Sequence, residues 1–285
     1  MPRRIIFVLV AAIVTLYFAI IAIMLTPLNG ARGSYYGRHY LNHFGFRPLP
    51  AVSWCRELTW RSPASPRATA LVSFPGSGNT WLRYLLQQAT GILTGSIYMD
   101  YGLRVHGFPA ENVTDGRVLV VKTHEKPPLE PDKFYSAVLL IRNPRDAVLA
   151  DFNRLHKGHI GTAPLNAFDK LSHDHKTTEY VTNQLSAWEH LHRAWLTKFR
   201  GAIHVVDYDV LVHNTEEALQ GVLGFLNVNV TMEHMNCAMH HKEGIYRRKK
   251  TLKNFDPFTS SMYKDIENVR SKVLKLVKKY KENHR

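Results

Sequence analysis

Short apolar segments alternate with longer amphipathic segments along most of the chain. Four of the short segments are rich in β-branched residues, as buried parallel strands are. They are Thr69–Phe74, Arg117–Lys122, Ala137–Arg142 and Ile203–Tyr208. Apolar residues at helical spacing mark Trp81–Ala89, Asp146–Arg154, Thr182–Phe199, Glu216–Leu226 and a last stretch after Thr259. This alternation predicts an α/β fold, with a parallel sheet flanked by crossover helices.

The most apolar segment lies at the N-terminus. Residues Ile5–Leu25 carry no charge over 21 positions, and as a helix they would extend about 31 Å, close to the thickness of a bilayer's hydrocarbon core. Arg3 and Arg4 precede them, which favours a cytosolic N-terminus. We therefore expect one transmembrane signal anchor; a cleaved signal peptide, whose apolar core is normally shorter, is the alternative. The predicted order is a cytosolic tail 1–4, the anchor 5–25, a lumenal stem 26–67 and one globular domain 68–285.

Composition adds a compartment and a class of ligand to this prediction. The formal net charge is +14. Behind a membrane anchor this charge favours anionic small molecules and glycans, and the sequence carries no recognisable nucleic-acid-binding module. The two cysteines, Cys55 and Cys237, are expected either to form one disulfide or to stay separate buried thiols. The triplets that begin at Asn112 and Asn229 match the N-glycosylation pattern and predict a glycoprotein.

A glycine-rich turn stands between the first predicted strand and the first predicted helix. Residues Phe74–Trp81 read FPGSGNTW. A strand, a tight turn and a helix N-terminus in this order cradle phosphate, because backbone N–H groups point at the anion and the helix dipole adds positive charge. The turn lacks the lysine of nucleotide triphosphatases and the third glycine of dinucleotide-binding turns. It therefore predicts another phosphorylated small molecule, and a plain strand-to-helix turn is the alternative.

Basic and titratable residues follow two of the other predicted strands. They are Lys122, Thr123, His124 and Glu125 after the second strand, and Arg142 after the third. Ligands of α/β sheets bind at the carboxyl ends of the strands, so these side chains are expected near the glycine-rich turn. A basic run at 247–250 and the sequence DPFT at 256–259 come later in the chain.

Taken in this order, the segments from about Thr69 to Thr259 resemble the sulfotransferases that use 3′-phosphoadenosine-5′-phosphosulfate (PAPS). The resemblance implies the sulfotransferase fold, a P-loop-like parallel sheet flanked by helices, with PAPS as co-substrate, PAP as product and no metal. It assigns the 5′-phosphosulfate to Pro75, Gly76, Ser77, Gly78, Asn79, Thr80 and Trp81. It assigns the 3′-phosphate to Arg142, with Arg248 and Lys249 of the basic run as further ligands.

The segments FPGSGNTWLRYLL and DPFT are most similar to those of the WSC-domain-containing sulfotransferases, which sulfate sialic acid on glycans. This sequence has no Cys-rich WSC module. The resemblance implies a type II membrane sulfotransferase of the Golgi, with its catalytic domain in the lumen. Its acceptor is expected to be a glycan hydroxyl group, with sialic acid as the candidate sugar.

The lysine-threonine-histidine triplet implies the catalytic roles. Lys122 is expected to offset the charge on the oxygen that departs with PAP, and His124 to take the proton of the acceptor hydroxyl. Glu125 is the rival base, because many Golgi carbohydrate sulfotransferases use a carboxylate. The sequence shows no H-E-x-x-H or other tight set of metal ligands.

Two departures from the family pattern keep other functions open. Cytosolic members carry a lysine where this chain has Gly76, and a serine where it has Ala150. Lys122 and Arg83 are the candidates to replace the missing charge. The alternative is a catalytically silent protein that binds PAP or a glycan on the same fold. A small-molecule kinase fits less well, because the turn lacks the phosphate-binding lysine.

Overall fold

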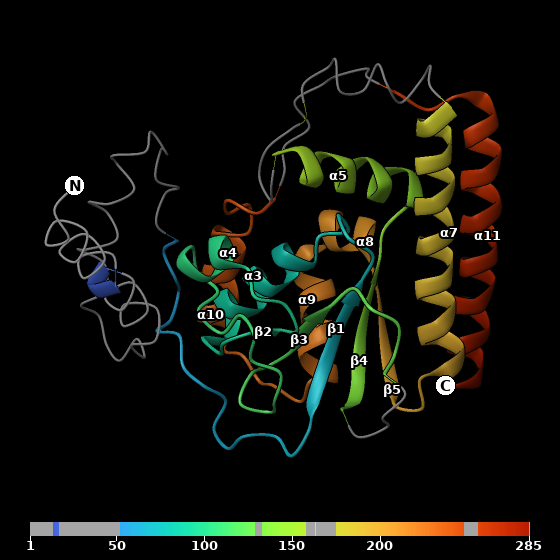
Figure 1. Ribbon diagram of the computed structural model, residues 1–285. Helices are drawn as coiled ribbons and strands as arrows, with labels where there is room; N and C mark the ends of the chain where they lie inside the picture. Colours follow the sequence, from blue (N-terminus) through green and yellow to red (C-terminus); the bar gives the residue numbers. More distant parts are fainter. Residues whose placement is uncertain are drawn as a thin grey trace, which may run out of the picture. The chain divides into compact units, whose positions relative to one another are not determined.

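The predicted parallel sheet is present and has β1 in its middle. This computed structural model describes residues 14–16, 52–128, 133–157, 163, 175–247 and 256–284; within them five parallel strands pair in the order β2-β3-β1-β4-β5. The strands are β1 (Ala68–Ser73), β2 (Gly95–Ser96), β3 (Val121–Thr123), β4 (Phe134–Ile141) and β5 (Ala202–Asp207). Because all pairs are parallel, the carboxyl ends of the strands share one edge of the sheet (Figure 1).

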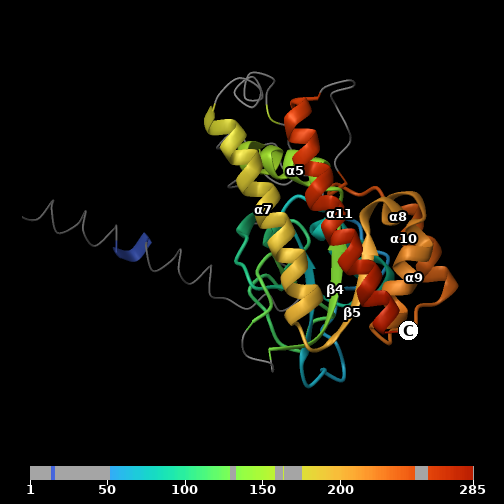
Figure 2. The same cartoon turned by 90° about the vertical axis from the view of Figure 1, so that its right-hand side faces the viewer.

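Helices cover both faces of this sheet. They are α3 (Asn79–Thr90), α4 (Tyr101–Val105), α5 (Pro144–Lys157), α7 (His175–Lys198), α8 (Tyr208–His213), α9 (Thr215–Phe225), α10 (Met232–His240) and α11 (Ser260–Asn283). On one face α7 and α11 run side by side (Figures 1 and 2), and Trp188 and Trp195 of α7 share a core with Val72 of β1. On the other face the core contains Leu71 of β1 and Leu85 of α3. The neighbouring residues 71 and 72 thus point to opposite faces, as the period of a strand requires.

The predicted α/β fold with a parallel sheet is confirmed, and its errors have local causes. The strand expected at Arg117–Lys122 is shorter, because Val118–Val120 are buried but only Val121–Thr123 pair in the ladder. Strand β2 was not predicted, since two residues, Gly95 and Ser96, carry no apolar pattern. The helices α4, α8 and α10 were also missed; each is short, from five to nine residues.

The transmembrane helix in the predicted fold is wrong for the part of the chain that the structure describes. There, no helix combines the length and the apolar character needed to cross a bilayer. The two helices of 24 residues, α7 and α11, contain many charged residues, which a hydrocarbon core excludes. Of the predicted anchor 5–25, residues 14–16 are described and the rest lie outside the described residues.

The two cysteines are joined, so the first of the two expectations for them is the one observed. Cys55 forms a disulfide with Cys237 of α10 across 182 residues of sequence. The segment around Cys55 also contacts α3. The Cys55 backbone N–H donates to Gln88 Oε1 at 2.9 Å, and Gln88 Nε2 donates to the carbonyl of Ser53 at 2.8 Å. This segment of the predicted stem therefore packs on the sheet domain.

Candidate functional site at the carboxyl edge of the sheet

The glycine-rich turn leaves β1 and starts α3, as predicted. Gly78 is the N-cap of α3 in a left-handed conformation, with φ of 91°. The turn is closed by a hydrogen bond from the Ser77 N–H to the Phe74 carbonyl, at 3.2 Å. Ser77 Oγ is buried and has no hydrogen-bond partner among the described residues. A buried hydroxyl without a hydrogen-bond partner is costly. An anion bound at the turn would accept a hydrogen bond from Ser77 Oγ, so the buried hydroxyl fits an anion site.

The remaining residues of the turn divide into structural and accessible ones. Asn79 is buried, and its Nδ2 donates to the carbonyl of Leu71 at 3.0 Å and to Ser73 Oγ at 3.2 Å. Asn79 therefore braces the turn against β1. Pro75 and Thr80 are half-buried. Of the predicted donor-binding residues here, Asn79 is thus held by β1 and Thr80 retains surface for a ligand.

Tight packing explains both glycines of the turn. Gly76 has φ of 76°, and a Cβ placed on it would lie 2.6 Å from the backbone nitrogen of Asp151 in α5. A Cβ on Gly78 would lie 2.6 Å from the ring of Tyr208. Both values are below any real van der Waals contact, so only glycine fits at either position. The lysine that cytosolic members carry at the position of Gly76 is incompatible with the closeness of α5.

Arg142 follows β4 and touches the turn directly. Its Nη1 donates to the Gly76 carbonyl at 2.8 Å, and its guanidinium carbon lies 4.3 Å from the centre of the Tyr208 ring. The carbonyl of Arg142 accepts a hydrogen bond from Trp188 Nε1 at 3.2 Å, which ties the strand end to α7. Arg142 Nε is buried and has no partner within the described chain. It is the second buried donor at this edge that is available to an anion.

Lys122 is the middle residue of β3, one residue before the carboxyl end of that strand. Its register partners are Leu71 on β1 and Ser96 on β2, so two strands enclose it. Burial, and then the positive charge of Arg83, lower the pKa of Lys122 to about 8. A bound anion would oppose this shift, because a negative charge favours the protonated amine.

His124 lies where β3 meets the turn. Its ring Nδ1 is 2.7 Å from the carbonyl of Ser73, the last residue of β1. A carbonyl accepts only, so Nδ1 carries the proton and the lone pair lies on Nε2, as in the tautomer of a general base. The backbone N–H of His124 donates to the hydroxyl of Tyr98 at 3.0 Å, and the two rings stack with centroids 5.7 Å apart.

Glu125, the rival base, is exposed and is held through its backbone. Its N–H donates to Thr123 Oγ1 at 3.1 Å, and its carbonyl accepts from Trp195 Nε1 at 2.8 Å. These bonds fix the main chain of Glu125 and leave the direction of its carboxylate unrestrained by them.

The structure describes the chain on either side of the two basic candidates in the run at 247–250. Arg248 and Lys249 lie outside the described residues. The chain just before them is anchored on α3, where Trp81 Nε1 donates to the Lys242 carbonyl at 2.7 Å and the guanidinium of Arg247 lies 5.1 Å from the Trp81 ring. After them, Asp256 of the DPFT segment accepts from Arg145 at 3.1 Å. Both flanks are therefore fixed to elements that adjoin the turn or Arg142.

Arg83 does not replace the missing lysine of the turn. Its side chain is fully buried, with Nη1 2.6 Å from Glu111 Oε1 and Nε 3.0 Å from Thr94 Oγ1. These contacts hold the guanidinium in the core, where it stabilises the fold. Lys122 is therefore the remaining candidate for the positive charge that the turn lacks.

Sequence reasoning missed one aromatic residue of this edge, Tyr98, and assigned no role in the site to another, Tyr208. Tyr208 follows β5 and covers both Gly78 and Arg142. Tyr98 follows β2 and contacts His124. A signal for Tyr208 was present, since it ends a predicted strand. No local signal marks Tyr98, because the strand before it has only two residues.

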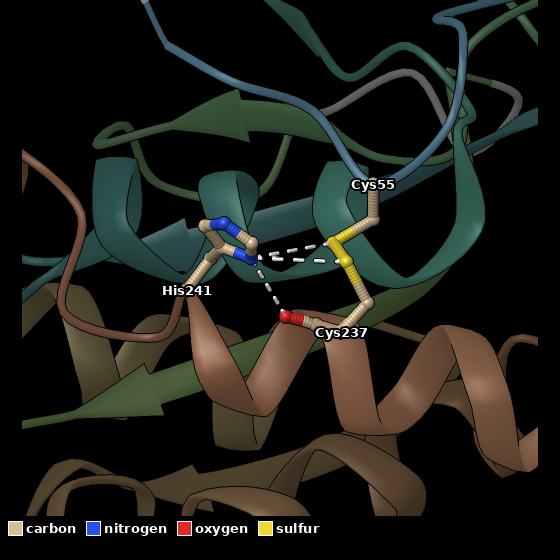
Figure 3. A group of neighbouring side chains, drawn as sticks. All are labelled: Cys55, Cys237 and His241. Atoms are coloured by element: carbon tan, nitrogen blue, oxygen red, sulfur yellow. Dashed lines mark hydrogen bonds between the residues drawn. A yellow bond between two sulfur atoms is a disulfide. The ribbon is translucent and has the colours of Figure 1, made fainter.

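A second cluster joins Cys55, Cys237 and His241 (Figure 3). His241 Nδ1 lies 3.8 Å from the sulfur of Cys55, 3.7 Å from that of Cys237 and 3.0 Å from the Cys237 carbonyl. Within the described residues this is the one group of three potential metal ligands. Metals bind thiolates, and the two sulfurs are bonded to each other. The cluster is therefore a structural bridge.

Comparison with known proteins identifies the family. The family model described as "Sulfotransferase domain" matches residues 66–283. A WSCD family member from Aedes aegypti is 46% identical over 248 residues, 79% of this chain and 78% of the relative. One from Drosophila melanogaster is 52% identical over 205 residues, 72% of this chain and 64% of the relative. Mouse sulfotransferase SULT7A1 complexed with PAP aligns with a TM-score of 0.46 and 14% identity, over 78% of this chain and 89% of that one. The chain belongs to the sulfotransferase domain family and, within it, is related to the WSCD proteins, which confirms the expected class of PAPS-dependent sulfotransferase.

Proposed function

We propose that this protein transfers the sulfuryl group of PAPS to a hydroxyl group of a glycan. One observation carries the proposal: His124 and Arg142 both hydrogen-bond to the main chain at the glycine-rich turn. His124 Nδ1 is 2.7 Å from the Ser73 carbonyl, and Arg142 Nη1 is 2.8 Å from the Gly76 carbonyl. A base and an anion-binding group are thereby fixed to carbonyls only three residues apart in the sequence, beside a turn suited to phosphate.

Three kinds of hydrogen-bonding group would hold the phosphates of the sulfate donor, PAPS. These are the N–H groups of the turn, the hydroxyls of Ser77 and Thr80, and the guanidinium of Arg142. Two buried donors, Ser77 Oγ and Arg142 Nε, have no partner among the described residues, and both fit the phosphates of PAPS. The activated sulfuryl group is the chemistry that PAPS supplies when it is bound.

In the proposed mechanism His124 acts as the base and Lys122 as the counter-charge. His124 Nε2 takes the proton of the acceptor hydroxyl while the oxygen of that hydroxyl forms the new bond to sulfur. The bond from sulfur to the phosphate oxygen breaks, and Lys122 offsets the charge that develops there. We favour His124 over Glu125, because its ring is oriented by a hydrogen bond and by stacking, whereas Glu125 is exposed and held only through its backbone.

The acceptor and the compartment are proposed from the family and from the chemistry of the chain. The relation to WSCD proteins and the net charge of +14 favour an anionic glycan, with sialic acid as the first candidate. The disulfide favours an oxidising compartment. The exposed side chains of Asn112 and Asn229 are open to glycosylation. We therefore propose that the domain works as a glycoprotein in the lumen of the Golgi.

The test is transfer of labelled sulfate from PAPS by the full chain to sialylated glycans and to their desialylated counterparts. We expect transfer to the sialylated set. His124→Asn should lower kcat by about 10²–10⁴-fold, while Glu125→Gln stays near the wild-type rate. His190→Asn, an exposed histidine of α7, is the matched control. Binding of PAP without transfer to any glycan would instead support the silent binding protein.

A further inference from the structure

Tyr98 is held rigidly beside the end of β3. Its backbone N–H donates to Ser96 Oγ at 3.0 Å, and its carbonyl accepts from the Asn112 N–H at 2.9 Å. The hydrogen bond from the Ile97 N–H to the Lys122 carbonyl, at 3.0 Å, fixes the preceding residue to β3. Three hydrogen bonds at two successive residues thus fix the main chain that carries the Tyr98 ring.

From this position Tyr98 contacts both groups that are proposed to act in the transfer. Its hydroxyl accepts the backbone N–H of His124 at 3.0 Å, and its ring stacks on the imidazole with an angle of 24° between the planes. The ammonium group of Lys122 lies 5.9 Å from the centre of the same ring, within the range of a cation–π interaction. One half-buried side chain therefore connects the base and the counter-charge.

The stacking adds a second restraint on the imidazole. The hydrogen bond from His124 Nδ1 to the Ser73 carbonyl fixes the position of one ring atom, and the contact with the Tyr98 ring opposes tilting of the imidazole plane. Both contacts therefore help to orient the Nε2 atom.

We propose that Tyr98 is the positioning residue of the transfer: it sets the plane of the His124 imidazole and supports the charge of Lys122. It exchanges no proton and touches no reacting atom in this role. The inference rests on the proposed function of His124 and Lys122. Misplacement of a catalytic group by about 1 Å can cost on the order of 10²-fold in rate, so the larger effect belongs in kcat and only a smaller one in donor affinity.

The test compares two substitutions in the full chain. Tyr98→Leu removes the ring, and we expect kcat to fall by about 10–100-fold, while PAP affinity and the KM for PAPS change by roughly fivefold at most, the effect of losing one cation–π contact to Lys122. Tyr98→Phe keeps the ring and loses the hydroxyl, so it should retain most of kcat. Tyr135→Leu and Tyr135→Phe are matched controls, because Tyr135 is partly exposed near the start of β4, at the opposite edge of the sheet.

Nuclear magnetic resonance of histidine-labelled protein gives a readout that does not depend on activity. The His124 ring protons, assigned by their loss in His124→Asn, should show a ring-current shift that disappears in Tyr98→Leu and persists in Tyr98→Phe. An unchanged His124 signal or an unchanged kcat in Tyr98→Leu would overturn the role of Tyr98. A wild-type chain that transfers no sulfate from PAPS would overturn the proposed function and this role with it.

Discussion

Lys122 is only 6% exposed, so its amine is a titratable group in a buried position. Burial and then Arg83 lower the pKa of its amine to about 8, whereas an unfolded lysine titrates near about 10.4. Between these values the unfolded chain binds more protons than the folded chain, so the free energy of unfolding rises with pH across this window. Below about pH 8 the full cost of the buried charge remains.

Lys122→Met should therefore stabilise the protein while it impairs donor binding. At pH 7 we expect the free energy of unfolding to rise by up to about 3 kcal/mol, measured by urea denaturation. PAP affinity of the wild type should fall as the pH rises through 8, because Lys122 loses its proton there, while phosphate groups titrate near about pH 6. In Lys122→Met the affinity should be lower and nearly independent of pH in this range. The exposed Lys126→Met is the control; equal PAP affinity in both variants would refute the role.

The turn between β1 and α3 owes its shape to its neighbours as much as to its sequence. Helix α5 presses against Gly76, and Tyr208 at the start of α8 presses against Gly78. The departure at Gly76 that raised the possibility of a silent protein thus has a steric cause. A turn enclosed in this way is preorganised, because its backbone N–H groups cannot collapse onto other partners when no anion is bound.

Gly76→Ala tests this enclosure. The new Cβ would meet the backbone of α5 at 2.6 Å, at a φ of 76° that disfavours any side chain. We expect a loss of about 1–3 kcal/mol in the free energy of unfolding and at least a tenfold weaker affinity for PAP by calorimetry. Gly224→Ala on α9 is the control, since its Cβ would meet nothing within 4 Å, and it should be neutral or slightly stabilising. Similar PAP affinity in the two variants would argue against a tight turn.

The parts of the site that sequence could predict are those carried by local pattern. The apolar runs located β1 and β4, so Gly76 and Arg142 fell at strand ends without further information. Tyr98 could not be found this way, because its contact with His124 depends on the pairing of β2 with β3. The apolar pattern of a strand does not predict which strand pairs with it. The same limit hid the contact of Tyr208 with the turn, because its ring covers Gly78, about 130 residues earlier in the sequence.

Across the whole domain, one covalent bond joins distant parts of the chain. The disulfide links the segment before β1 to α10 over 182 residues. The same end of α10 is held to α3 by Tyr84, whose hydroxyl donates to the His241 carbonyl at 2.8 Å, and by the bond from Trp81 to Lys242. The disulfide therefore adds to contacts that already fix this end of α10 beside the turn.

Replacement of both cysteines by serine should separate stability from donor binding. A cross-link over so long a loop restricts the unfolded chain strongly, so the double variant should lose about 2–5 kcal/mol in the free energy of unfolding. PAP affinity at 25 °C should change little, because Tyr84 and Trp81 still hold α10. Thermal unfolding with and without a dithiol reductant checks the cause: the reductant should lower the Tm of the wild type to that of the variant and leave the variant unaffected. A wild-type Tm that ignores the reductant would contradict a stabilising bridge, and a large loss of PAP affinity at full folding would mean that the disulfide, and not the α3 contacts, positions the end of α10.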